Sequence, residues 1–179
     1  MGEMAVHLSE YNPLWPQAFA EQRDRLAIAL GPWLHGTIQH IGSTAIPGMP
    51  AKPIIDIAAP VTSLTEAHQA VVALQRTGWR YWPTDPNRSW RLWFLYPRPQ
   101  ARTHHLYLIE HDDPHLRELS AFRDQLRASD TLCAQYADLK HTLAQANRND
   151  RDAYTRAKTD FVANVLQQAG FELAPRSVD

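Results

Sequence analysis

The chain has 179 residues, of which 44% are hydrophobic and 21% charged, and these values predict one globular domain over residues 1–179. Its net charge of −1 argues against a protein that coats DNA, and its single cysteine excludes an internal disulfide bond and a cysteine-based zinc cluster. No stretch approaches the length of a membrane span and no apolar leader opens the chain, so we expect a cytoplasmic protein without a membrane partner.

The first two thirds of the chain alternate between helical and strand patterns. Apolar spacing and turn residues predict an edge strand at 6–8, a helix at 13–30, strands at 37–41 and 54–59, and a helix at 63–77. Three further strands are expected at 79–82, 91–96 and 103–110. The last two should form a hairpin, because a loop of turn residues joins them.

From residue 113 onward the pattern is helical throughout. Asp113, Ser129 and either Asn149 or Asp150 have the side chains of helix N-caps, and each precedes an apolar stripe at helical spacing. The residues after Gly170, 171–179, are expected to form a loose tail. Strands first and helices last predict an α+β domain.

The most informative stretch is residues 40–59. A short strand leads into Gly42-Ser43, a loop of prolines and glycines with one lysine, Lys52, follows, and an apolar strand then presents a single carboxylate, Asp56. A glycine lets the backbone approach a phosphate closely, and the hydroxyl beside it adds a donor. A carboxylate on a rigid strand is suited to hold Mg²⁺ against that phosphate. The pattern therefore predicts a nucleotide-handling site.

The spacing between Ser43 and Asp56 resembles the signature of polymerase-beta-like nucleotidyltransferases. In that signature, Gly and Gly/Ser are followed by an acidic residue, a hydrophobic residue and a second acidic residue. The second acidic position is Ala58 in this chain. Two-metal phosphoryl transfer needs several carboxylates around the ions. The resemblance therefore supports a nucleotide-binding fold more directly than a working transferase.

A second resemblance covers most of the chain and is more specific. Its motifs occur in family order and resemble the GrpB family over residues 6–165: Tyr11-Asn-Pro-Leu-Trp15, His40-Ile-Gly-Ser-Thr44, Ala51-Lys-Pro-Ile-Ile-Asp-Ile57, His104-His-Leu106, Phe122-Arg-Asp-Gln-Leu-Arg127, Tyr136-Ala-Asp-Leu-Lys140 and Tyr154 to Lys158. One departure stands out: Tyr107 replaces the last histidine of a family run that often reads His-His-Leu-His-Leu. The family itself commonly lacks the second acid at the position of Ala58.

The GrpB resemblance implies a fold and two alternative functions. The implied fold is a nucleotidyltransferase-like mixed sheet with an N-terminal helix and a C-terminal group of three helices. The first function is binding of a nucleotide or another phosphorylated small molecule, with Mg²⁺ as cofactor and nucleotidyl transfer as the reaction of an active enzyme. The alternative is a non-catalytic accessory module with a protein partner, serving coenzyme A synthesis or protein folding, because related domains are fused to dephospho-CoA kinases.

Asp56 and His105 are the candidate catalytic and metal-binding residues. A carboxylate inside an apolar strand is costly unless it is paired, so Asp56 either faces a ligand or is a structural acid with a buried partner. His105 shares a strand face with Tyr107 and is a candidate third ligand for metal or phosphate, or else a core histidine. His40 has the same two interpretations. Lys52 either neutralises phosphate or is a solvated loop residue.

Basic residues on the C-terminal helices are candidates for holding the remaining phosphate charge. Arg123 and Arg127 are four residues apart and share a helix face, while Lys140 and Lys158 take corresponding places on the next two helices. The alternative is ordinary surface charge, with Asp124 pairing with Arg127. Because all four basic residues fall in GrpB motifs, we expect a basic wall facing a cleft that Ser43, Asp56 and His105 also line.

Overall fold

The structure is a computed structural model that describes residues 7–147, 153 and 156–174. Its sheet has five strands in the order β1-β2-β5-β4-β3. The strands are β1 (Gln39–Ile41), β2 (Ile55–Val61), β3 (Arg80–Tyr81), β4 (Leu92–Tyr96) and β5 (His104–Glu110). β2 and β5 are parallel at the centre, and the other neighbouring pairs are antiparallel. The sheet is therefore mixed.

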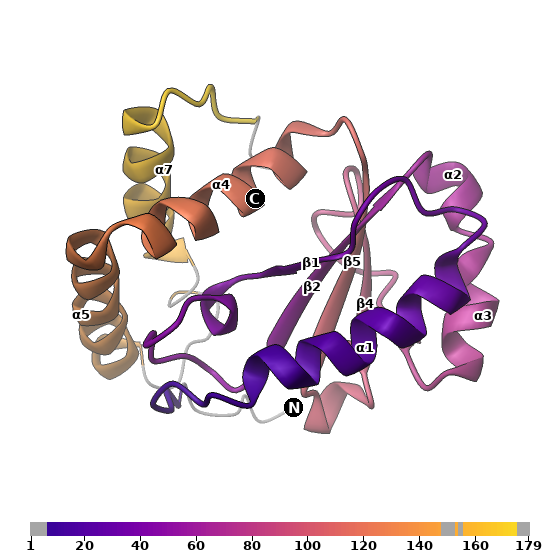
Figure 1. Ribbon diagram of the computed structural model, residues 1–179, viewed down its shortest axis with the longest axis horizontal. Helices are drawn as coiled ribbons and strands as arrows, with labels where there is room; N and C mark the ends of the chain where they lie inside the picture. The colour runs from indigo at the N-terminus through magenta and orange to yellow at the C-terminus, as the bar shows by residue number, and fades with distance from the viewer. Residues whose placement is uncertain (1–6, 148–152, 154–155, 175–179) are drawn as a thin grey trace.

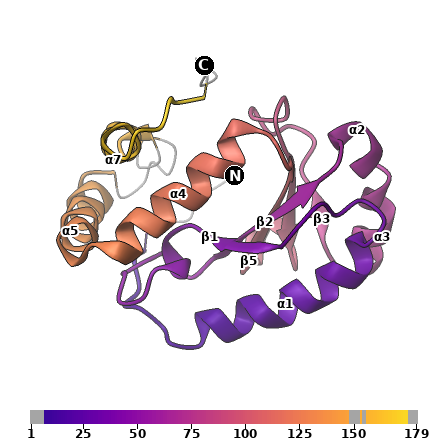
Figure 2. The same cartoon turned by 45° about the horizontal axis from the view of Figure 1, so that its top comes forward.

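Helices cover both faces of this sheet. α1 (Trp15–Leu30) and α3 (Ala70–Arg76) lie on one face, and α4 (Pro114–Ala128) lies on the other (Figures 1 and 2). α5 (Asp130–Ala146) and α7 (Thr159–Gln168) lie beside α4, beyond the end of β1 (Figure 2). Short elements complete the described chain: α2 (Leu64–Ala67) and the 3₁₀ turns η1 (Ser43–Ala45) and η2 (Pro99–Ala101).

Alternation along β2 and β5 divides the sheet into a closed face and a partly open one. Ile55, Ile57, Leu106 and Leu108 point to the α1 side and are buried in the main core with Leu26. The intervening residues of both strands point to the α4 side. There Ala58 and Ile109 pack against Leu116 of α4. The start of β2 and of β5 on the α4 side belongs to a cavity.

The fold class inferred from sequence is confirmed, as is the β4–β5 hairpin. Asp113 and Ser129 are N-caps as expected, accepting hydrogen bonds from the His115 and Leu132 amides at 2.8 and 3.2 Å. The helix expected at 63–77 is instead two helices, α2 and α3. The chain tightens between them, because the Gln69 and Val71 amides bond to carbonyls three residues back.

Three other expectations fall wholly or partly outside the described residues. The N-cap expected at Asn149 or Asp150 lies outside them. Of the edge strand at 6–8, residue 6 is not described, and a single bridge joins Ser9 to Ala51. Of the tail, residues 171–174 are described; Ala174 is buried and its amide donates to Glu118 of α4. At least this part of the tail is packed against the domain.

Leu26 and Ile28 of α1 give a matched test of how α1 contributes to stability. Leu26 is 1% exposed against the sheet, whereas Ile28 is 85% exposed on the same helix. We expect Leu26→Ala to lower the free energy of unfolding by about 2–5 kcal/mol, because it removes buried methyl groups and leaves a cavity. Ile28→Ala should change it by less than about 0.5 kcal/mol. Urea unfolding of both variants is the measurement, and equal losses would contradict this packing of α1.

Candidate functional site

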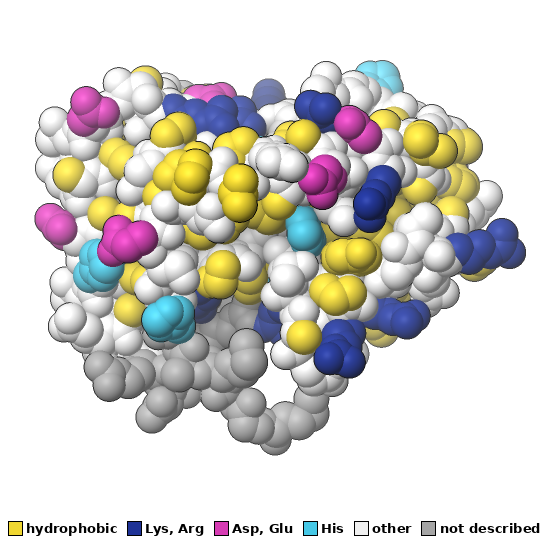
Figure 3. All heavy atoms as spheres, turned by 60° about the horizontal axis from the view of Figure 1, so that its bottom comes forward, with side chains coloured by type: hydrophobic (Ala, Val, Ile, Leu, Met, Phe, Trp, Pro, Cys, Tyr) yellow, Lys and Arg dark blue, Asp and Glu magenta, His cyan; other side chains and the backbone are white. Residues whose placement is uncertain are grey.

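A cavity of about 830 Å³ opens beside the start of β2 and β5 on the α4 side. Figure 3 shows a hollow on this face, with lysine and arginine side chains gathered in and around it. Ser43, Lys52, Asp56, His105 and Lys140, all predicted site residues, line the cavity together. Its other polar and aromatic lining residues are Thr44, Trp82, Asp85, Asn87, Arg91, Trp93, Arg102, Tyr107, Arg156 and Lys158.

The Asp56 carboxylate lies at the centre of a small hydrogen-bonded group. Its Oδ1 atom lies 3.0 Å from Nδ1 of His105 and accepts a hydrogen bond from the Tyr107 hydroxyl at 3.2 Å. Asp56 and His105 are partners in the parallel β2–β5 register, which is why the two side chains meet. The side chain of Asp56 remains 27% exposed, toward the cavity.

The pKa of Asp56 lies below its usual value although burial acts in the opposite direction. Burial raises the pKa, but the hydrogen bond from His105, the His105 ring charge and the Tyr107 hydrogen bond together outweigh it. The same neighbourhood raises the pKa of Tyr107, first through burial and then through the Asp56 charge. Asp56 is therefore ionised at neutral pH, and Tyr107 is a neutral donor.

His105 has one ring nitrogen engaged and one without a described partner. Since ionised Asp56 can only accept, Nδ1 of His105 carries the proton that it shares with Oδ1. Nε2 is buried and has no hydrogen-bond partner among the described residues. The indole nitrogen of Trp93, which also lines the cavity, has none there either. A ligand or water can satisfy both nitrogens.

Gly42 adjoins the carboxylate rather than lining the cavity. Its φ of +70° is one that L side chains rarely adopt, and a Cβ here would lie 2.6 Å from Oδ2 of Asp56. The turn into Ser43 can pass the carboxylate only because residue 42 has no side chain. The predicted phosphate role of Gly42 stays a prediction, while its contact with Asp56 gives it a definite structural one.

His40 holds the two ends of the loop that follows β1. Thr44 donates to the Ile54 carbonyl at 3.2 Å, so it accepts from Nε2 of His40, which lies 3.0 Å away. The ring also stacks on Phe19, with centroids 4.8 Å apart. Burial lowers the pKa of His40 to about 4, which keeps the ring neutral at physiological pH. His40 is therefore a buried histidine that anchors the loop.

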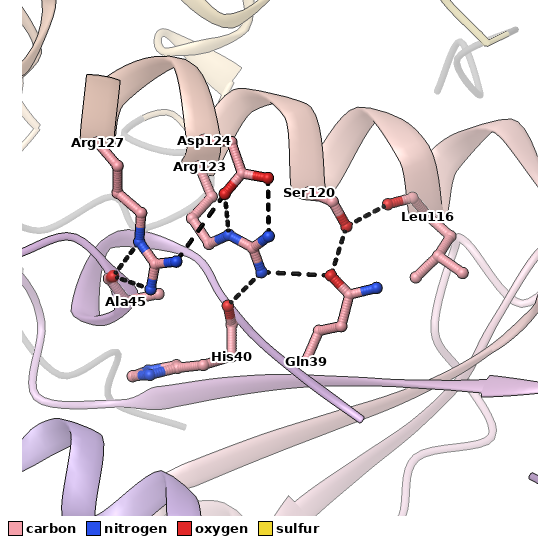
Figure 4. Close-up of polar contacts among 8 residues, drawn as sticks. All are labelled: Gln39, His40, Ala45, Leu116, Ser120, Arg123, Asp124 and Arg127. Carbon is pink, nitrogen blue, oxygen red and sulfur yellow. Dashed lines mark hydrogen bonds and ion pairs between the residues drawn. The ribbon is translucent and has the colours of Figure 1, made fainter. Parts of the chain in front are cut away.

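The structure does not bring Arg123 and Arg127 to the cavity. Arg123 donates to the His40 carbonyl at 2.9 Å and pairs with Asp124, and Arg127 donates twice to the Ala45 carbonyl, at 2.9 and 2.6 Å. Figure 4 shows both guanidinium groups reaching from α4 to β1 and the turn after it. The spacing of two arginines predicts that they share a helix face, but it does not predict which residues that face contacts. Here it meets the carbonyls of His40 and Ala45, and Arg123 also donates to the side chains of Gln39 and Asp124.

The positive charge of the cavity comes from other residues. Lys140 is 2% exposed, donates to the Pro50 carbonyl and lies with its ammonium 5.3 Å from the Tyr136 ring centroid. Burial and the nearby charges of Lys158 and Lys52 lower the pKa of Lys140 to about 7. An amine on the cavity wall is thus partly neutral at physiological pH.

Arg91 and Asp85 form a buried ion pair on another wall. The guanidinium donates to both carboxylate oxygens at 2.6 and 3.0 Å, and it lies over the rings of Trp90, Trp93 and Tyr107. Burial lowers the pKa of Arg91. The hydrogen bonds to Asp85 raise it by more, so the pKa lies above its usual value. Asp85 is therefore already committed to Arg91.

Sequence reasoning did not select the lining residues between 82 and 102, namely Trp82, Asp85, Asn87, Arg91, Trp93 and Arg102. They come from a turn-rich loop and from β4, whose distance from Asp56 along the chain hides their proximity. One signal in the sequence does point to the cavity. The chain contains three lysines, Lys52, Lys140 and Lys158, and all three line it.

The described side chains do not fit a Mg²⁺ site on their own. Among them, no group of three or more His, Cys, Asp or Glu residues could hold one ion. Asp85 pairs with Arg91, and His105 points its Nδ1 at Asp56 instead of converging with it on a cation. Mg²⁺ prefers an octahedron of oxygens. No step that uses Mg²⁺ follows from this donor set, and the metal roles given to Asp56 and His105 stay predictions.

Ala58, at the place of the second acid, faces α4 rather than the cavity. It is fully buried with Ile41, Ile109 and Leu116. It lies on the same strand face as Asp56, as alternation predicts. α4 covers that face two residues beyond Asp56, so the position lies inside an apolar cluster.

The comparison with known proteins agrees with the motifs. The GrpB family model, described as GrpB protein, matches residues 5–168. A UPF0157 protein of Pseudomonas aeruginosa is 38% identical over 164 residues, which are 88% of this chain and 65% of that protein. The crystal structure of conserved protein GrpB from Enterococcus faecalis superimposes with a TM-score of 0.82 at 30% identity, covering 91% of this chain and 96% of that one. Fold and sequence thus define a GrpB-type α+β domain. The chain belongs to the GrpB family.

Some relatives are longer than the shared region. The chain spans 65% of the Pseudomonas protein and 47% of a UPF0157 protein of Bacillus subtilis that is 32% identical over 164 residues. A dephospho-CoA kinase of Mycolicibacterium paratuberculosis is 26% identical over 189 residues, which are 92% of this chain and 46% of the kinase. Within the described part of this chain, no helix is both long and apolar enough to cross a membrane.

The burial of Ala58 makes a direct prediction. Ala58→Asp should lower the free energy of unfolding by at least about 3 kcal/mol, because it places a carboxylate without a partner in an apolar cluster. Ala134→Asp, on the exposed face of α5, is the matched control and should cost less than about 0.5 kcal/mol. Denaturant unfolding compares the two. A fully stable Ala58→Asp protein would place residue 58 on the cavity wall.

Lys140 should make stability depend on pH. Its pKa is about 7 in the folded protein and 10.5 as an ordinary lysine, so the unfolded chain binds more protons between these values. The free energy of unfolding should therefore rise with pH, by about 2 kcal/mol from pH 7 to pH 9. In Lys140→Met this rise should disappear, whereas in Arg25→Met, an exposed control on α1, it should remain. Urea unfolding at three pH values measures it. An unchanged slope in Lys140→Met would assign the titration to another group.

Proposed function

We propose that the cavity binds a phosphorylated small molecule, a nucleotide or another phosphate ester. The single observation that carries this proposal is the concentration of positive charge on the cavity wall in a protein whose net charge is −1. Six basic residues line it, Lys52, Arg91, Arg102, Lys140, Arg156 and Lys158, against two acidic ones, Asp56 and Asp85.

The chemistry of these groups favours a phosphate over a simple carboxylate. Because Arg91 is matched by Asp85 and one further carboxylate is present, the remaining lining charge is positive. A concave site focuses such a field and attracts anions of high charge. Lysine and arginine together offer point charges and planar donors, the usual means of holding phosphate oxygens. A cavity of about 830 Å³ also falls in the size range of small-molecule and cofactor sites.

Recognition of the rest of the ligand would use the aromatic wall. Trp82 and Trp93 line the cavity together with Arg91, and the buried nitrogens of Trp93 and His105 that lack a partner among the described residues are polar groups that a ligand can bind. They suit a ligand with polar atoms beyond its phosphate, for example a hydroxyl or the edge of a nucleobase. This supports a nucleotide, or a comparable ester with a polar head, over inorganic phosphate.

We propose binding rather than Mg²⁺-dependent nucleotidyl transfer. Two-metal transfer requires carboxylates that clamp two ions. Asp56 is the one cavity carboxylate not paired with arginine among the described residues, and the second position of the motif is Ala58 under α4. Basic side chains can neutralise a phosphate without an ion. Mg²⁺ that enters the cavity bound to a nucleotide is a separate question, which experiments with and without Mg²⁺ address.

The alternative function is an accessory module that acts with a protein partner. The similarity to a dephospho-CoA kinase, over 92% of this chain, favours this alternative. Both functions predict binding of the same class of ligand, because dephospho-coenzyme A is itself a nucleotide bearing phosphates. A binding profile restricted to coenzyme A precursors would favour the accessory role.

Ligand-dependent thermal stability tests the proposal. Inorganic phosphate, nucleotides and coenzyme A precursors should be screened with Mg²⁺ and with a chelator. A ligand present at a hundred times its Kd stabilises the folded protein by about 2.7 kcal/mol, which is a rise of about 5–10 °C in Tm for a chain of this size. If no phosphorylated compound raises Tm under either condition, the proposal is wrong.

A pair of arginine variants ties the binding to the cavity. Arg102→Ala removes a cavity charge and should weaken the best ligand about tenfold or more, the value of one charge-assisted hydrogen bond. Arg25→Ala removes the same charge from the exposed face of α1 and should leave Kd unchanged. Titration calorimetry gives both values. Equal weakening would mean that the effect is one of net charge, not of this site.

A further inference from the structure

The distribution of lysine is the most specific chemical feature of this cavity. The chain has fifteen arginines and three lysines, and every lysine lines the cavity. The two side chains differ in one respect that matters here. A lysine amine can lose its proton and form a covalent bond to carbon, whereas a guanidinium stays charged in proteins.

Lys140 is the lysine whose surroundings prepare it for such a bond. It is 2% exposed, and its described contacts are the Pro50 carbonyl and the ring of Tyr136. Among the described residues, no carboxylate pairs with its ammonium. Buried ammonium without a counter-charge is unfavourable, and the group relieves this by releasing its proton.

The charges of the neighbouring lysines act on Lys140 in the same direction as burial. Burial lowers its pKa most, then the charges of Lys158 and Lys52, while Cys133 and Asp56 oppose them, and the result is about 7. Near neutral pH part of the molecules therefore carry a free amine. Desolvation together with an adjacent cation is the arrangement that activates lysine as a nucleophile. The hydrogen bond to Pro50 uses one N–H and leaves the nitrogen lone pair available.

We propose that Lys140 binds the carbonyl carbon of a phosphorylated aldehyde or ketone as an imine, while the other cavity cations hold its phosphate. This inference rests on the proposed phosphate-ester function and narrows its ligand class. The amine nitrogen forms a bond to the carbonyl carbon, and the carbonyl oxygen leaves as water with the two amine protons. No oxidant, reductant or metal is required, and the bond reverses by hydrolysis.

Borohydride trapping on the intact protein tests the imine directly. Pyridoxal 5′-phosphate is the probe, because it carries an aldehyde and a phosphate monoester. The protein is incubated with it at pH 7, reduced with sodium borohydride and digested for mass spectrometry. We expect label on Lys140 at about ten times the level on Lys52 or Lys158, which serve as internal controls for cavity amines. Label spread evenly over the three lysines would overturn the proposal.

Two comparisons test the phosphate part of the inference. Pyridoxal, which has the aldehyde without the phosphate, should label Lys140 about tenfold less, the value of one charge-assisted contact. Arg102→Ala should reduce labelling by pyridoxal 5′-phosphate to a similar degree, and Arg25→Ala should not. Equal labelling by the two aldehydes would show a reactive amine without a phosphate site, and the proposal would be wrong.

The outcome separates this inference from the function on which it rests. If phosphorylated ligands raise Tm but Lys140 is not labelled, the cavity binds phosphate esters and the imine alone is refuted. If no ligand raises Tm and Lys140 is not labelled, both are refuted. Lys140→Arg adds a control that lacks the nucleophilic amine, and it should lose the label at position 140.

Discussion

The close approach of the Gly42 backbone to the Asp56 carboxylate is the constraint on which the site depends. Asp56 projects from the central strand β2, and β1 runs antiparallel beside it. Any side chain at residue 42 would collide with Oδ2. The chain therefore leaves β1 through a left-handed glycine directly beside the carboxylate. This brings Ser43 and Thr44 to the cavity and directs the following loop toward α5.

Several independent contacts then hold that loop in place. His40 and Thr44 tie its start to Ile54 at its end, and Arg123 and Arg127 hold it from α4. Lys140 reaches its middle at Pro50. The loop also buries Ile46 and Met49 in an apolar cluster with Leu126 and Tyr136, so polar contacts from three elements act together with a small core. The cavity wall can be rigid although most of the residues from 42 to 54 are outside regular structure.

The sequence predicted the fold and the centre of the site because local patterns carry both. Alternation in β2 and β5 places Asp56, His105 and Tyr107 on one face, and the GrpB motifs give the order of elements. Arg123 and Arg127 show where such reasoning ends. Their spacing predicts a shared helix face correctly, but the partner of that face depends on how α4 crosses the sheet. Ala58 shows the same limit. Alternation predicts which face of β2 carries Ala58, but it does not predict that α4 buries that position.

The arginines of α4 and the loop they hold have a consequence for how this domain can diversify. Arg123 and Arg127 bind the carbonyl oxygens of His40 and Ala45, groups that every amino acid provides. Their contacts are therefore indifferent to the side chain of Ser43, which lies between these carbonyls and lines the cavity. A substitution of Ser43 can alter what the cavity wall offers to a ligand while the path of the chain is kept. In such a scaffold, ligand specificity can change without a change in the backbone conformation of the loop.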